Sequence, residues 1–266
     1  MQPGGFIGAL WQFVKGHRIA LPSSVFHIEN ISMNIYSIEE LCYYMYHNIY
    51  LLDETIINEG LCFWLRDELN LRRLYQKLYT LLDAKGSMGE FILPIFKEIN
   101  YLSFAEFKEM NKQLKIFEEQ PEVVRLKIKG DYLFNHEKYI NAIRVYTEAL
   151  QKAKGGTLGT QFTGSIYNNM GCSYAKLFQT EEAFECFGQA YEVLHSGGAL
   201  KSYLFAAYLN KGKETYETLC DEKGVDTQTK QEMDAQIRKA QEVVLPKEID
   251  PLLDTWTKNY HRNTGL

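Results

Sequence analysis

The sequence predicts an all-α protein, and three observations support that fold class. Proline is scarce, with 6 in 266 residues, so long uninterrupted helices are permitted. From Ser37 onward, apolar residues recur at spacings of three and four. In the second half, one arrangement of small and bulky residues occurs twice. We therefore expect two domains, residues 1–120 and 121–266, with a solenoid of two to three helix hairpins packed on an N-terminal helical bundle.

The first residues carry the weakest helical signal. Residues 17–36 alternate in part between apolar and polar types, which allows one short β-hairpin near the N-terminus. The apolar run Phe6 to Val14 is too short to span a membrane and lacks the features of a signal peptide. We expect it to be a docked N-terminal segment or the trace of an upstream piece. No membrane span and a cytoplasmic location are expected.

Helix-start signals divide the rest of the first half. Ser37 to Glu40 reads as a capping box, followed by an apolar stripe that predicts one helix as far as Leu52. Further stripes predict helices over 57–65, 71–82 and 91–99, with Pro94 in the first turns of the last. A second capping box, Ser103 to Glu106, opens a helix to Phe117. Tyrosines 43, 44, 46 and 50 exceed what one buried stripe needs, so they line the core or form a contact surface.

The repeat in the second half is anchored on two glycines, Gly130 and Gly171. Small residues let two helices of a hairpin approach closely, and large ones fill the space beside them. The matched residues at 12, 16 and 19 positions after each glycine are Ala142 and Ala183, Tyr146 and Phe187, and Ala149 and Ala190.

These offsets resemble the tetratricopeptide repeat, a helix-turn-helix unit. Residues 123–156 and 164–197 match well, separated by an insertion over Lys154 to Phe162 that holds three glycines. Residues 199–222 and 227–245 suggest a degenerate third hairpin or a capping pair, because Phe205 replaces the small residue and Glu217 replaces the alanine. The resemblance covers about 123–245, and the N-terminal part resembles no family. Asp250-Pro251 predicts a short terminal helix through Trp256.

The resemblance implies a concave groove, lined by the first helix of each hairpin, that takes a peptide or a helix of a partner. Some family members clamp a C-terminal carboxylate; Lys127 and Asn169 match clamp-like positions, whereas Asp131 would repel an acidic terminus. Cys172, Ser202 and Ala206 also fall on the groove side. The partner-binding residues carried over by position are Lys127, Asp131, Phe134, Asn135, Asn168, Asn169, Lys176 and Asn210.

The sequence shows no residue pattern typical of a catalytic, metal or cofactor site. The 6 histidines show no metal-ligand spacing, and the 5 cysteines suggest buried free thiols. The stretch Gly155 to Thr160 lacks the lysine of a phosphate loop. A basic cluster near the third helix, formed by Arg66, Arg72, Arg73 and Lys77, is expected to pair with Asp67 and Glu68 on the surface. The net charge of -5 disfavours nucleic-acid binding.

We therefore expect a non-enzymatic interaction module or scaffold with a protein or peptide partner. The alternatives are a peptide- or ligand-responsive regulator and, third, an enzyme in the unassigned N-terminal domain. Because two repeats bury little surface alone, the N-terminal bundle must pack on them or a homodimer must form.

Overall fold

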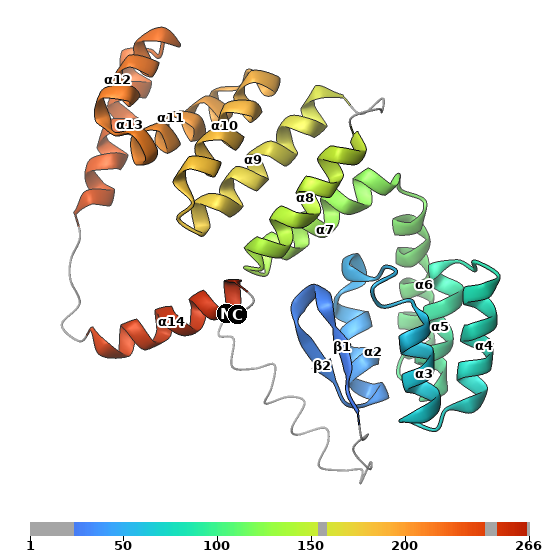
Figure 1. Cartoon of the computed structure of the whole chain (residues 1–266). Coiled ribbons are helices and arrows are strands. Elements are labelled where there is room, and N and C mark those ends of the chain that lie inside the picture. Colours follow the sequence, from blue (N-terminus) through green and yellow to red (C-terminus); the bar gives the residue numbers. More distant parts are fainter. Residues whose placement is uncertain (1–23, 154–158, 243–248, 265–266) are drawn as a thin grey trace. The chain divides into compact units, whose positions relative to one another are not determined.

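The structure, a computed structural model, describes residues 24–153, 159–242 and 249–264 (Figure 1). The described elements are α-helices, two short 3-10 helices and two short strands, which confirms the all-α class. The chain divides into two compact units between Pro121 and Glu122. The apolar run Phe6 to Val14 and residues 154–158 of the expected insertion lie outside the described residues.

The N-terminal unit opens with the expected β-hairpin. Strand β1 (Phe26–Ile28) pairs antiparallel with β2 (Met33–Ile35), and the 3-10 helix η1 (Glu29–Ile31) joins them. Phe26, Ile28 and Ile35 are buried, while the intervening residues of the strands are more exposed. The hairpin is thus held by one apolar face against the helical core, since two strands alone are marginally stable.

The first helix is shorter than its apolar stripe predicts. Helix α2 (Ile38–His47) ends at Asn48 and the 3-10 helix η2 (Ile49–Leu51) follows. The Asn48 side-chain amide donates to the Tyr44 carbonyl at 2.7 Å, so a side chain takes an acceptor of the last turn. At its start, Ser37 accepts from the Glu40 N–H, but the Glu40 carboxylate accepts from the Tyr36 N–H, at 2.7 Å. The expected capping box is therefore only half formed, because the Glu40 carboxylate binds the N–H of the residue before Ser37 and not that of Ser37 itself.

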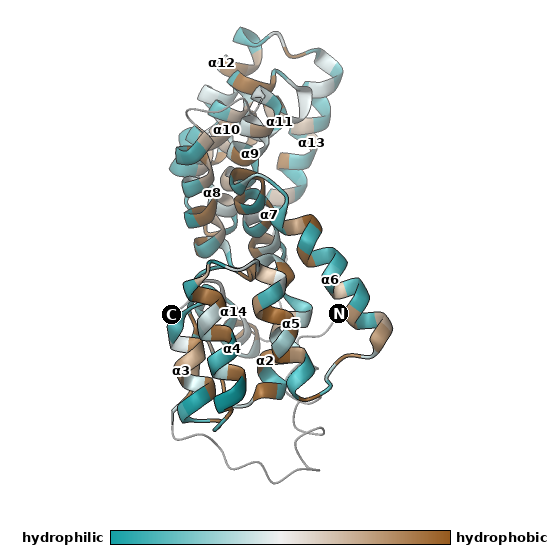
Figure 2. Ribbon diagram, turned by 90° about the vertical axis from the view of Figure 1, so that its right-hand side faces the viewer, coloured by the Kyte–Doolittle hydropathy of each residue, from teal (hydrophilic) through white to brown (hydrophobic). Residues whose placement is uncertain are grey.

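Four further helices follow in the described part of this unit: α3 (Glu59–Asp67), α4 (Arg72–Asp83), α5 (Met88–Glu98) and α6 (Phe104–Glu118). The capping box at Ser103 is present, and Ser87 and Glu90 form another that the sequence analysis missed. Because Ser87 starts α5, Pro94 lies inside that helix and not in its first turns, which corrects the expectation. Of the four tyrosines, Tyr44 is buried, whereas Tyr50 is 43% exposed. Figure 2 shows polar and apolar residues alternating along α6.

The second unit is a series of helices in which each member from α7 to α11 packs on the next. Figure 1 shows them following one another along the unit. The helices are α7 (Glu122–Asn135), α8 (Tyr139–Ala153), α9 (Thr160–Lys176), α10 (Thr180–Leu194), α11 (Gly197–Lys211), α12 (Lys213–Glu222), α13 (Thr227–Gln241) and α14 (Asp250–Thr264). The terminal helix runs past Trp256 and is longer than expected.

The two repeat glycines lie at tight helix crossings. A Cβ added to Gly130 would lie 2.5 Å from the Tyr146 ring, and one added to Gly171 would lie 2.9 Å from the Phe187 ring. Both distances are too short for a side chain, so each aromatic ring occupies the space that the glycine leaves. The expected close approach is confirmed in α7–α8 and α9–α10. The alanines at the matched offsets are also buried.

The turn between the two helices falls at the same repeat position in all three hairpins. Glu137, Phe178 and Gly212 have φ values of 60°, 60° and 90°, in the left-handed region. Each stands seven residues after its reference position, which is Gly130, Gly171 or Phe205. The first two hairpins thus bear the strain of a non-glycine residue at this turn, whereas the third has glycine there.

Packing inside the third hairpin differs from that in the other two. Helix α12 begins directly after Gly212, so the buried face of α12 is shifted by one residue. Tyr216 is buried, while Glu217 is exposed and pairs with Lys213 at 3.5 Å. Phe205 packs against a cluster that includes Cys220 and, from α13, Met233. Helix α13 thereby covers the end of the series, as a capping helix should.

Candidate protein-interaction surface

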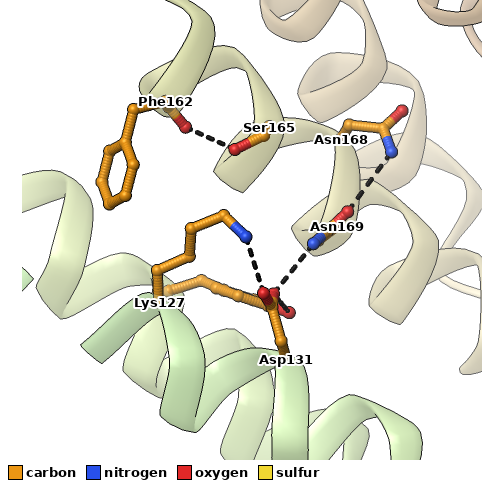
Figure 3. A network of polar contacts seen from close by, with 7 residues as sticks. Lys127, Asp131, Phe162, Ser165, Asn168 and Asn169 are labelled. Atoms are coloured by element: carbon orange, nitrogen blue, oxygen red, sulfur yellow. Dashed lines mark hydrogen bonds and ion pairs between the residues drawn. The ribbon is translucent and has the colours of Figure 1, made fainter. Parts of the chain in front are cut away.

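The first pair of site residues lies one turn apart on α7. The Lys127 Nζ and Asp131 Oδ2 atoms are 2.6 Å apart, an ion pair at the (i, i+4) spacing (Figure 3). The Lys127 side chain is 21% exposed and that of Asp131 is 34% exposed. Both charges are therefore partly shielded from water and oriented by each other.

The Asp131 carboxylate also joins three helices. Its Oδ1 atom accepts a hydrogen bond from the Tyr146 hydroxyl on α8, at 2.7 Å, and from the Asn169 Nδ2 on α9, at 2.9 Å. Figure 3 shows Lys127 and Asn169 both pointing toward Asp131. Burial, followed by the hydrogen bond to Asp131, raises the pKa of Tyr146 above its usual range, which keeps the phenol protonated as a donor.

Asn168 stands beside this network without being fixed by it. Its Nδ2 lies 3.4 Å from the Asn169 Oδ1, a long hydrogen bond (Figure 3). Asn169 and Lys127 are engaged with Asp131, so a terminal carboxylate would have to displace Asp131 to reach them. The geometry therefore does not favour a carboxylate clamp.

The other four predicted residues do not join this cluster. The Phe134 ring packs 5.5 Å from that of Tyr139, and Asn135 is exposed at the end of α7. Lys176 is exposed in the last turn of α9. The Asn210 Oδ1 accepts from the Thr180 hydroxyl at 3.4 Å, while its buried Nδ2 has no hydrogen-bond partner among the described residues. The structure thus brings together four of the eight predicted residues: Lys127, Asp131, Asn168 and Asn169.

Ala206 does not belong to the surface that the resemblance implied. It is buried in a cluster with Ala183 and Phe187. The α11 helix therefore uses this position to pack on α10. Its expected groove position is wrong.

The sequence analysis missed exposed apolar residues on α11 and in the turn after α9. Leu209 on α11 is 68% exposed, and Phe178, in the turn after α9, is 90% exposed. Leu209 stands four residues after Phe205, as Phe134 stands four after Gly130. Applying the repeat offset to the third hairpin would have found Leu209, whereas the left-handed turn at Phe178 has no sequence signal.

The remaining chemistry of the described residues is mostly structural. All five cysteines are free, and only Cys172 is not fully buried. Burial raises the pKa of Cys62 to about 11 and that of Cys186 to about 12, so neither is an activated thiolate. Among the residues that the structure describes, no group of three His, Cys, Asp or Glu side chains is placed to hold a metal ion. The helices within the same ranges are too short or too polar to cross a membrane.

The basic cluster of the N-terminal unit contains an ion pair between Arg66 and Asp67. Arg66 forms two hydrogen bonds with Asp67, the shorter at 2.6 Å, and its guanidinium lies over the Phe63 and Tyr75 rings. Glu68 accepts from the Ser24 N–H at 3.0 Å. The expected pairing is confirmed for Arg66 and Asp67.

No protein-family model, no curated protein and no solved structure matches this chain.

Proposed function

We propose that this protein is an interaction module, and that the surface of α7, α9 and α11 binds a peptide or helix of a partner protein. The observation that carries the proposal is the hydrogen bond of Asn169 to Asp131, which joins the first helices of two equivalent hairpins. Equivalent side chains of successive hairpins then lie on adjacent helices. Such a strip suits a partner that extends across several helices.

The strip offers both polar and apolar contacts. Asn168 has donor and acceptor groups suited to a peptide backbone, and Lys176 is an exposed cation. Leu209 supplies exposed apolar surface at the α11 end. The Lys127–Asp131–Asn169 network holds its side chains in place before binding, which reduces the ordering cost of association.

A peptide-display selection on the full chain tests the proposal. The site variant changes Asn168, Lys176 and Leu209 together to alanine, because none of them holds the network together. The control variant changes three exposed residues of the second helices, Arg144→Ala, Glu185→Ala and Gln189→Ala. We expect peptides enriched by the wild-type chain to bind the control variant as tightly, and to bind the site variant at least tenfold more weakly.

Equal binding to wild type and both variants would contradict the α7–α9–α11 surface. Equal loss in both variants would contradict it too, because the effect would then not depend on the face. Circular dichroism of both variants checks that the helical content is unchanged.

A further inference from the structure

The terminal helix α14 carries an exposed apolar stripe that the proposed function does not use. Ile249, whose carbonyl accepts the Leu253 N–H, stands just before the helix and is 44% exposed. Leu253, Trp256 and Tyr260 are 47%, 55% and 58% exposed. At 3.6 residues per turn, these four positions fall within an arc of about 60°. They therefore form one narrow stripe, which we call the α14 stripe.

Helix α14 contacts α8 through only a few residues, which gives the helix little support from the rest of the described chain. Of the residues of α14 whose side chains are described, none is buried and only Leu252 is half-buried. A helix of 15 residues is marginal in water on its own, and most helices in proteins are stabilised by packing an apolar face. A stripe with large side chains on such a helix is typical of a docking face.

The spacing of the stripe matches a second copy of the same helix. The steps between its residues are four, three and four, so the pattern reads the same in both directions. An antiparallel copy would place Ile249 against Tyr260 and Leu253 against Trp256. Every layer then combines one aliphatic and one aromatic side chain. A parallel copy would instead place Trp256 against Trp256 and Leu253 against Leu253, which fills the layers unevenly.

The charges of α14 favour the same orientation. Asp250 and Asp254 lie in its first half, and Lys258 and His261 lie in its second half. An antiparallel pair sets each acidic half beside the half that carries Lys258, and it also opposes the two helix dipoles. A parallel pair would gather four carboxylates at one end.

We propose that α14 is a self-association element, and that two copies of this chain pair through antiparallel α14 stripes. The contact is two-fold symmetric, as most homodimer interfaces are. Its area is small compared with that of a permanent dimer, so the dimer dissociates on dilution. This proposal is independent of the α7–α9–α11 surface.

Sedimentation velocity of the full chain tests the pairing. Loading concentrations from about 1 to 100 μM span the range of weak association. We expect the wild-type mass to rise from one chain to two over this range, and the Trp256→Asp and Leu253→Asp variants to stay at one chain. Thr255→Asp adds the same charge to α14 away from the stripe, and it should associate like wild type.

A wild-type chain that stays monomeric throughout would overturn the proposal, as would a dimer that survives both stripe variants. Loss of the dimer in Thr255→Asp would also overturn it, because the stripe would then not be the determinant.

Oxidative cross-linking of a mixture tests the orientation. Chains with Ile249→Cys carry one affinity tag and chains with Tyr260→Cys carry another. The antiparallel pair predicts disulfides between differently tagged chains, in excess of the background from the native thiols in wild-type chains. Cross-links only between like-tagged chains would overturn the antiparallel arrangement.

Discussion

The first two hairpins of the C-terminal unit and the third solve one packing problem in opposite ways. In α7–α8 and α9–α10, glycine on the first helix faces an aromatic ring on the second, as Gly130 faces Tyr146. In α11–α12, the large residue, Phe205, is on the first helix, and a small one, Cys220, is in the cluster that it packs against. The exchange shows that a hairpin needs complementary volumes at the crossing, whichever helix supplies the larger one.

The largest effect is expected from removing the large member of each pair. Phe187→Ala should lower the free energy of unfolding by about 3–5 kcal/mol, because the ring is buried between helices. Phe205→Ala should cost less, since Phe205 is only half-buried in the folded chain. Urea unfolding followed by circular dichroism measures both. A larger loss for Phe205→Ala would show that the third hairpin depends more on its crossing than the second does.

Adding a methyl group at the small member should have the next largest effect. Gly130→Ala should destabilise by about 1–3 kcal/mol, because its Cβ would lie 2.5 Å from the Tyr146 ring. Gly198→Ala is the matched control, because a Cβ there meets nothing within 4 Å. Helix propensity should make that control more stable by up to about 1 kcal/mol. Thermal melts of the two variants measure the difference, and equal melting temperatures would argue against a tight crossing at Gly130.

The hydroxyl groups of Tyr146 and Tyr216 give a smaller effect. Tyr146 donates to Asp131 at 2.7 Å, and in the third hairpin Tyr216 donates to Asp234 on α13 at 2.8 Å. Tyr146→Phe and Tyr216→Phe should each cost about 1–2 kcal/mol, because each removes a donor from a carboxylate. Chemical denaturation of the single variants and the double variant measures them. The losses should add, since the two hydrogen bonds share no residue.

A further difference between α10 and α12 is expected in the pH dependence of the free energy of unfolding. Burial, followed by the charges of Glu185 and Glu182, raises the pKa of Cys186 from 9.0 to about 12. Between these values the folded chain keeps a proton that the unfolded chain releases, so the free energy of unfolding falls as pH rises.

In the Cys186→Ala variant, the free energy of unfolding should fall less steeply with pH when it is measured from pH 9 upward. Burial also raises the pKa of Cys220, but Lys230 and Tyr216 counteract the shift. Cys220→Ala should therefore change the pH slope less than Cys186→Ala does. The reverse order would contradict the assignment.

Features governed by local sequence were predictable. Ser103 and Glu106 cap α6 through bonds within four residues, and the offset from Gly130 to Tyr146 is fixed by one hairpin. The early end of α2 was not predictable, because it involves a hydrogen bond from the Asn48 side chain to the Tyr44 carbonyl, which the apolar periodicity does not reveal. The one-residue shift of α12 follows from Gly212, which ends one helix and starts the next.

The candidate site was predictable as a set of positions but not as a set of contacts. Position in the repeat placed Lys127, Asp131 and Asn169 on the same helices that the structure shows. It could not show that Asn169 binds Asp131, because that depends on how far α7 lies from α9, whereas the (i, i+4) pair of Lys127 and Asp131 depends on α7 alone. Ala206 was misplaced for the same reason: the packing of α11 on α10 decides which residue of α11 is buried.

The approach of α9 and α10 at two successive glycines has a consequence for the order of folding. A Cβ at Gly164 would lie 2.4 Å from the Leu194 side chain, so the two helices are close at the open end of the hairpin as well as at Gly171. Only three residues, 177–179, separate these helices, and closing so short a loop costs little chain entropy. We therefore expect α9–α10 to nucleate refolding of the C-terminal unit, and its amide protons to be the last in that unit to exchange with solvent deuterium.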